Sequence, residues 1–161
     1  MAYKAYSFIL KPTTAQLSSI RTTAGACRWV WNKMLAANIA RYAAEQKFIF
    51  GFDQHKLLPG LKKEHPWLCE PHSQSLQAKC SDLDVTLKRK IKNKSTTGFP
   101  KFKSKHHNSD SSRVPASFKL SNKGIKLPKI GWVRWKVDRK ISGKAKSVTV
   151  KQDGDRWVAL S

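Results

Sequence analysis

Acidic residues are scarce in this sequence, which has 10 Asp and Glu against 32 Lys and Arg and a formal net charge of +22. The imbalance is greatest in residues 88–161, where 21 basic side chains accompany only four acids. Such a charge opposes compact folding by self-repulsion and is usually offset by a polyanion. The composition therefore indicates that the partner is nucleic acid.

Cysteines are few and long apolar runs are absent. The three cysteines, at positions 27, 69 and 80, are an odd number at unrelated spacings, which argues against a disulfide framework. No stretch approaches ~20 uninterrupted apolar residues, and the N-terminus lacks the apolar block of a secretion signal. We therefore expect a protein of a reducing cytoplasm with no membrane partner. Its apolar content of 40% still suffices for a packed core.

The first half of the sequence predicts one strand followed by helices. Residues 4–11 alternate at period two, which is typical of a strand. A threonine at position 13 or 14 can cap a helix that runs to about residue 46. Its apolar stripe passes Gly25 in phase, which predicts one long helix. A short helix is expected at 54–63, and helical spacing returns between Pro71 and residue 94.

The second half predicts short strands, with a polar loop at 106–112. In the segment 132–137, alternation predicts that Val133 and Trp135 are buried while Arg134 and Lys136 face outward. The expected strands are 118–120, 124–127, 132–138, 147–151 and 156–160. The predicted fold is α+β, a small antiparallel β-barrel of residues 1–11 and 97–161 with an inserted helical lobe at 12–96.

The carboxylates and cysteines predict neither a catalytic centre nor a metal site. A metal-dependent nuclease needs two or three carboxylates converging on its ions. Asp82 and Asp84 are two apart on a predicted helix and do not share a face, and the acids of residues 153–155 fit a hairpin turn. Cys69-x-x-His72 offers zinc-ligand types without a paired-knuckle spacing.

Basic residues interleaved with aromatics are the strongest functional pattern. The segment 99–105, Phe-Pro-Lys-Phe-Lys-Ser-Lys, is typical of a groove that stacks bases and pairs phosphates. Alternatively, its phenylalanines anchor it to the core and its lysines are only solvated. Lys88 and Arg89 also suit the C-terminal end of a helix, and Arg21 and Arg28 share a helical face. The candidate contacts are Arg21, Arg28, Lys88, Arg89, Lys101, Lys103, Lys105, Arg134 and Lys136.

Several short runs occur in a diagnostic order along almost the whole chain. They are residues 6–13 (YSFILKPT), 25–32 (GACRWVWN), 73–77 (SQSLQ), 99–105 (FPKFKSK), 127–131 (LPKIG), 139–144 (RKISGK) and 153–157 (DGDRW). In this order they resemble the N-terminal half of the TnpB/OrfB proteins of bacterial insertion sequences. Those proteins are RNA-guided DNA nucleases related to type V CRISPR effectors.

The resemblance implies a wedge-like β-barrel interrupted by a helical recognition lobe. It implies three partners, namely a guide RNA, target double-stranded DNA and the RNA–DNA heteroduplex, which the protein holds by backbone shape. It also implies that Ser73, Gln74 and Gln77 approach the target-adjacent DNA, where glutamine can pair with adenine. The implied location is the bacterial or archaeal cytoplasm, near the nucleoid.

The family's nuclease domain and zinc ribbon would follow residue 161. The resemblance therefore implies that this chain alone does not cut DNA and needs no cofactor. Divalent metal is expected only in a nuclease domain, which a separate chain could supply. Three alternatives stay open, namely a stand-alone helix-turn-helix DNA-binding regulator, a truncated non-cleaving remnant and a basic ribosome-associated protein.

Overall fold

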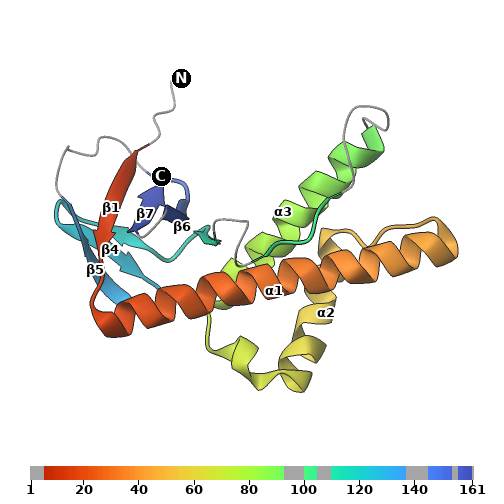
Figure 1. Cartoon of the computed structure of the whole chain (residues 1–161), viewed down its shortest axis with the longest axis horizontal. Helices are drawn as coiled ribbons and strands as arrows, with labels where there is room; N and C mark the ends of the chain where they lie inside the picture. Colours follow the sequence, from red (N-terminus) through yellow and green to blue (C-terminus); the bar gives the residue numbers. More distant parts are fainter. Residues whose placement is uncertain (1–5, 93–99, 105–109, 137–144, 154–155, 161) are drawn as a thin grey trace.

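The computed structural model describes residues 6–92, 100–104, 110–136, 145–153 and 156–160. Over these residues the fold is α+β, with three α-helices and a seven-stranded antiparallel sheet (Figure 1). The sheet lies at one end of a long helix, and the other helices pack against the remainder of that helix. The α+β class predicted from the sequence is confirmed.

A short strand and a long helix form the N-terminal part, as the periodicity predicts. Strand β1 is Ser7–Lys11 and helix α1 is Thr14–Glu45. Thr13 caps α1 through a reciprocal pair with Gln16, in which each side chain accepts a hydrogen bond from the other residue's backbone N–H. The helix passes through Gly25 without interruption, so the single long helix is confirmed.

Three further helical elements pack against the middle and C-terminal part of α1. Helix α2 is Gly51–Glu64, the 3-10 helix η1 is Pro66–Cys69 and α3 is Ser73–Lys92. The short helix predicted at 54–63 lies within α2, which begins three residues earlier, and no sequence pattern predicted η1. The helical core includes Val30, Met34, Leu35, Leu58, Leu68, Leu76, Cys80, Leu83 and Leu87.

The strands form one sheet with β1 at its centre. The other strands are β2 (Ser111–Val114), β3 (Lys119–Leu120), β4 (Gly124–Leu127), β5 (Gly131–Trp135), β6 (Val148–Asp153) and β7 (Arg156–Leu160). Their spatial order is β2-β6-β7-β1-β5-β4-β3. The first half of β1 pairs with β7 and its last two residues pair with β5. Because the two halves of the sheet share one apolar core, the sheet is strongly curled.

The predicted closed barrel is only partly supported. Among the described strands, β2 and β3 form the two edges and are not paired with each other, so the sheet is open. Strand β3 has only two residues, and β2 packs against α1 and α3 instead. The two helices thereby cover the β2 edge of the sheet, whereas in a closed barrel that edge would be paired with another strand.

Strand β2 corrects the predicted loop at 106–112. Ser111 and Ser112 belong to β2, where Ser112 pairs with Val150 of β6. Ser112 and Val114 are buried while the intervening Arg113 points away from the core. Hydrophobic alternation does not reveal a strand that buries a serine. Residues 105–109, and with them the candidate Lys105, lie outside the described residues.

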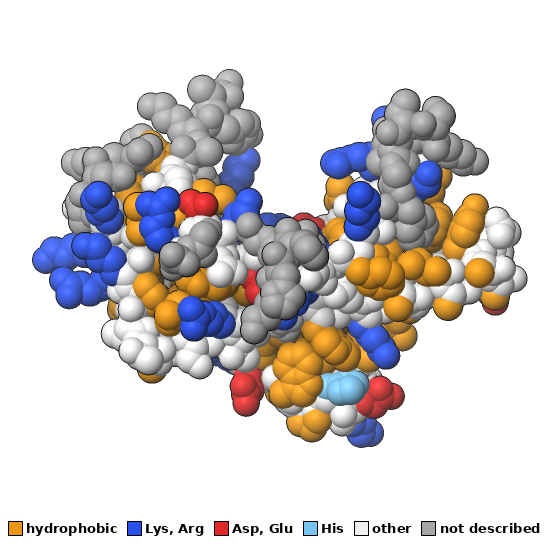
Figure 2. All heavy atoms as spheres, viewed as in Figure 1, with side chains coloured by type: hydrophobic (Ala, Val, Ile, Leu, Met, Phe, Trp, Pro, Cys, Tyr) orange, Lys and Arg blue, Asp and Glu red, His pale blue; other side chains and the backbone are white. Residues whose placement is uncertain are grey.

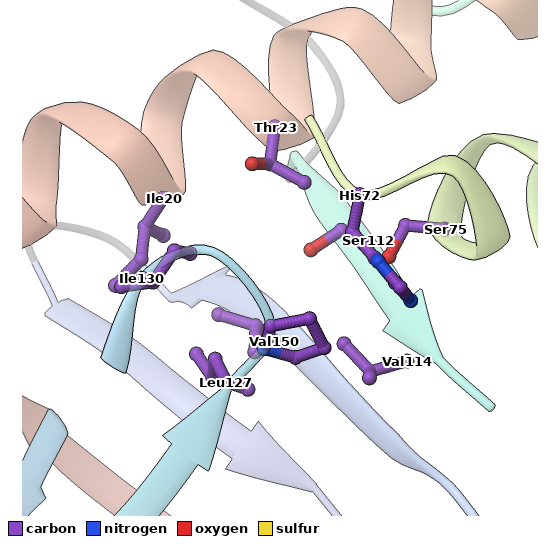
Figure 3. Close-up of a pocket in the computed structure, with 10 residues that line it drawn as sticks. Ile20, Thr23, His72, Ser75, Ser112, Val114, Leu127, Ile130 and Val150 are labelled. Carbon is purple, nitrogen blue, oxygen red and sulfur yellow. The ribbon is translucent and has the colours of Figure 1, made fainter. Parts of the chain in front are cut away.

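Helix α1 contributes to both cores, and a small cavity of about 10 Å³ lies near their junction (Figure 3). Ile20 and Thr23 of α1 face it from one side, and His72, Ser75 and Ser112 from another. Ser75 Oγ is buried there without a hydrogen-bond partner. A space of this size holds one water molecule at most. It is a packing defect between the sheet core and the helical core and not a ligand pocket.

Candidate nucleic-acid interface

Basic side chains lie on both sides of a hollow in the molecular surface. Figure 2 shows this hollow between the sheet and the C-terminal half of α3, with Lys and Arg side chains on each flank. A concave surface lined by one sign of charge focuses the electrostatic potential and attracts a polyanion.

The described part of the basic–aromatic segment, residues 100–104, is held along α1 by its backbone. Trp31 donates a hydrogen bond from Nε1 to the Lys101 carbonyl oxygen, at 2.9 Å. The Asn32 side chain donates to the Lys103 carbonyl oxygen at 2.8 Å and accepts from the Lys103 N–H at 2.7 Å. We call residues 100–104 with these contacts the latched segment. Its anchoring partners are two adjacent residues of α1.

The described side chains of the latched segment differ in exposure, and only Lys103 departs from both interpretations of the sequence. Phe102 is 52% exposed and Lys101 is exposed, so the described phenylalanine does not anchor the segment. Lys103 instead packs on α1, with its ammonium 4.5 Å from the centroid of the Trp31 ring. Burial lowers the pKa of Lys103, and the neighbouring charge of Lys79 lowers it further. Lys101 and Phe102 are thus the outward-facing pair.

The two arginines predicted on α1 have different surroundings. Arg21 is exposed. Arg28 is partly buried, and its Nη1 lies 2.6 Å from both carboxylate oxygens of Asp110. The Asp110 carbonyl oxygen also accepts a hydrogen bond from the Gln152 N–H. Arg28 therefore joins α1 to the start of β2, and Arg21 is the arginine of this pair that faces solvent.

Gln74 and Gln77 line an open groove of about 340 Å³ between α3, α2 and β2. Both are exposed, and His55 donates from Nε2 to the Gln77 carbonyl oxygen at 3.0 Å. Arg113 reaches the groove from β2 while it donates to the Ala78 carbonyl oxygen and to Asp82. Ser73 lies at the start of α3, where Lys62 donates to its hydroxyl. The sequence did not single out His55 and Arg113, because only the packing of α2 and β2 on α3 brings them here.

Cations also gather on the outer face of the sheet. Arg134 and Lys136 are exposed, as is Trp132, whereas Val133 and Trp135 are buried, which confirms the predicted faces of β5. The strand register adds residues that the sequence did not single out. Lys11 of β1 is opposite Arg134, and Lys119 of β3 is opposite Lys126 of β4. Like charges directly opposite destabilise a sheet, and a bound polyanion would neutralise them.

The cations of α3 lie in its last turns. Lys88 and Arg89 are exposed. The Lys88 ammonium is 3.1 Å from the Asp84 carboxylate, four residues earlier on the helix. Asp84 also accepts the backbone N–H of Gly51 at the start of α2. Arg89 is therefore the more available of the two candidates for an external anion.

The Asp82 and Asp84 carboxylates form contacts within the fold, and the Cys27 and Cys80 thiols are buried. Asp82 is paired with Arg113, and Asp84 holds the start of α2. Burial raises the pKa of both the Cys27 and the Cys80 thiols to about 12. Within the residues that the structure describes, no three His, Cys, Asp or Glu side chains are grouped so that they could hold a metal ion.

A family model supports the resemblance noted in the sequence. The model, HTH_OrfB_IS605, is described as a helix-turn-helix domain and matches residues 1–47. The described part of this segment consists of β1 and the uninterrupted helix α1, so residues 14–45 contain no turn. Over its first 47 residues the chain is therefore similar to the N-terminal helix-turn-helix domain of OrfB-type insertion-sequence proteins.

A curated relative extends this match over the rest of the chain. InsQ of Escherichia coli (strain K12), which bears the name of an RNA-guided DNA endonuclease, is 35% identical over 158 residues. The alignment covers 96% of this chain but 39% of InsQ, so the chain spans about two fifths of the length of this relative.

Among the described residues, no helix is both long and apolar enough to cross a bilayer.

Proposed function

We propose that this chain is the guide-RNA- and target-DNA-binding part of a TnpB-type RNA-guided DNA endonuclease. In this proposal both lobes hold nucleic acid by its backbone and shape, while base pairing between guide and target reads the sequence. The alignment with InsQ over 96% of the chain supports the class of partner. The proposed place of action is the cytoplasm, at the nucleoid.

The latched segment is the observation that carries the proposal. Hydrogen bonds from Trp31 and Asn32 fix its backbone, so Lys101 and Phe102 point outward from an ordered support. A cation beside an exposed ring can pair a phosphate and stack a base at the same time. We assign both roles to this pair. Arg21, Arg89 and the outer face of the sheet would extend the phosphate contacts.

The groove on α3 is the proposed contact with target-adjacent DNA. Its exposed Gln74 and Gln77 side chains each carry a donor and an acceptor, the combination that pairs with adenine in the major groove. Arg113 supplies a cation at the other wall. A groove with both base-reading amides and a cation fits duplex DNA better than it fits an apolar ligand. Ser73, bound by Lys62, would position the start of α3.

The proposal assigns no catalytic role to this chain. Asp82 and Asp84 are the two carboxylates of α3, and both are bound by groups of the chain itself. Cleavage and its divalent metal would belong to a nuclease domain. The purified chain is therefore expected not to cut DNA in the presence of Mg²⁺ or Mn²⁺.

The test is to purify the chain without nuclease treatment from cells that carry its native locus and to sequence the bound nucleic acid. One structured RNA that maps beside or over its own gene is the expected result. A mixture of unrelated cellular RNA would contradict the guide-binding role and leave only non-specific adhesion. Enriched duplex DNA with a shared motif would favour a stand-alone regulator, the function that the helix-turn-helix description suggests.

A further inference from the structure

The C-terminal ends of α1 and α3 lie at the end of the molecule farthest from the sheet (Figure 1). An open cleft of about 670 Å³ lies there, between the last turns of both helices and the connection from α1 to α2. We call it the distal cleft. Its size is within the range of pockets that bind small molecules and single groups of polymers. None of the candidate contacts predicted from the sequence lines it.

Aromatic rings form one wall of the distal cleft. The rings of Tyr42 and Phe48 are nearly parallel, with centroids 4.8 Å apart and an interplanar angle of 8°. Phe50 meets Phe48 edge to face, at 6.4 Å. Tyr42 is 41% exposed although it packs on Phe48. The stack therefore offers an aromatic face to an external planar group.

Cations surround this aromatic wall. Arg41, Lys47 and Lys90 line the cleft, and no carboxylate is among its described lining residues. The nearby acid Glu45 is bound to Arg41 at 3.3 Å. The Lys88 ammonium lies 5.5 Å from the centroid of the Phe50 ring. An occupant that is planar and apolar on one side and anionic on the other would satisfy both features.

We propose that the distal cleft binds an unpaired nucleotide of single-stranded nucleic acid. The base stacks on the Tyr42–Phe48 pair, and Lys47 and Lys90 contact the adjoining phosphates. A base within a duplex cannot reach the rings, because both of its faces are already stacked. A second copy of this chain, at +22, would meet a cationic cleft with its own positive charge. The inference rests on the proposed nucleic-acid binding and assigns it a second, strand-selective site.

The test compares two probes, a short uridine-rich RNA with one 2-aminopurine and a covalently closed circular duplex DNA, which has no terminal base pair. The full chain is expected to quench the 2-aminopurine fluorescence by stacking. Tyr42→Leu should reduce the quenching to the part that stacking on Phe102 produces and weaken RNA binding roughly 5- to 150-fold, the range of one lost base–aromatic stack. Tyr42→Phe keeps the ring and should retain both signals. Duplex affinity should be equal for the three proteins.

Trp67→Leu is the matched control. Trp67 lies in η1, is 39% exposed and packs edge to face on Trp29 of α1, away from the distal cleft. This variant should keep wild-type quenching and affinity. Wild-type RNA affinity in Tyr42→Leu would overturn the distal site while leaving the proposed function intact. Failure of the unmodified chain to bind either probe would instead overturn the proposed function. A dimer that Tyr42→Leu dissociates would assign the cleft to a second copy and contradict this proposal.

Discussion

At the scale of single residues, two tryptophans three positions apart on β5 have opposite environments. Trp135 is 5% exposed, stacks on Phe8 at a centroid distance of 4.3 Å and donates to the Asn122 carbonyl oxygen. Trp132 is 48% exposed on the outer face. Since burial and not residue type sets the cost of removing an aromatic ring, the two positions form a natural pair for comparison.

Trp135→Ala is expected to lower the free energy of unfolding by about 3–5 kcal/mol, because it leaves a cavity in the sheet core and an unpaired carbonyl at Asn122. Chemical denaturation followed by fluorescence or circular dichroism measures this loss. Trp132→Ala is the control and should change stability by less than about 0.5 kcal/mol. Equal effects of the two variants would show that the assigned faces of β5 are wrong.

Asn32 is the residue on which the latched segment most depends. Asn32→Ala leaves the N–H and the carbonyl of Lys103 without their partner, which should cost about 1–3 kcal/mol. Asn32→Asp should also release the segment, because a carboxylate then faces the Lys103 carbonyl. Limited proteolysis near residues 100–104 and RNA affinity are the measurements. The exposed Asn122→Ala is the control, and wild-type protease resistance in Asn32→Asp would contradict the latch.

At the scale of elements, helix α1 connects the two lobes. Ile20 and Ala24 belong to the sheet core, whereas Val30 and Leu35 belong to the helical core. The segment that the helix-turn-helix family model matches is therefore a continuous support here. Any tilt of one lobe against the other would have to bend this helix or break contacts on one side of it.

The effect of replacing Gly25 on stability distinguishes a continuous helix from a helix-turn-helix. A Cβ added at Gly25 would meet only the Arg28 guanidinium, at 3.7 Å, which is an ordinary contact. Gly25→Ala should therefore raise the free energy of unfolding by about 0.5–1 kcal/mol through helix propensity. Thermal or chemical denaturation measures the change. A marked loss of stability would indicate that Gly25 occupies a turn.

Replacing a lysine on the outer face of the sheet is expected to have opposite effects on stability and on nucleic-acid binding. Lys119 and Lys126 are exposed and directly opposite each other on β3 and β4. Lys126→Gln should raise stability by about 0.2–1 kcal/mol by removing the like-charge pair, yet weaken nucleic-acid binding. Denaturation and filter binding measure the two effects. Lys63→Gln on α2 is the control for binding and should leave affinity nearly unchanged, and stronger binding by Lys126→Gln would contradict a phosphate contact here.

At the scale of the whole molecule, charge determines the strength of binding. A chain of +22 that contacts phosphates releases counterions from nucleic acid when it binds. In the proposed complex, the two lobes, the latched segment and the sheet face would all contribute cations to this effect. For probes unrelated to the guide RNA, affinity should consequently depend on salt more than on probe sequence.

Binding measured against salt concentration should give a straight log–log plot. For ~6 phosphate contacts the expected slope is roughly −4 to −5.5, which spans single-stranded and duplex nucleic acid. Titrations with RNA and with duplex DNA, at several salt concentrations, supply the data. A slope near zero would contradict the electrostatic basis of binding, whatever the affinity at one salt concentration.

Local sequence was sufficient for most elements, because their signals lie within a few residues. Thr13 and Gln16 specify the start of α1, and alternation around Trp135 specifies the faces of β5. The charge imbalance indicated a polyanionic partner without any fold. Since periodicity and capping are local interactions, they can be read before the chain is folded in space.

The tertiary structure alone decided which distant residues meet. Strand β2 could not be predicted because Ser112 is buried only through pairing with Val150, and the sheet stays open because α1 and α3 cover that edge. Hydrogen bonds that hold the latched segment join Asn32 to Lys103, which is 71 positions away, and the pairing of β3 with β4 places Lys119 opposite Lys126. No local pattern encodes such pairs. The sequence by itself determined the elements and the charge, whereas long-range packing determined the surface on which that charge can act.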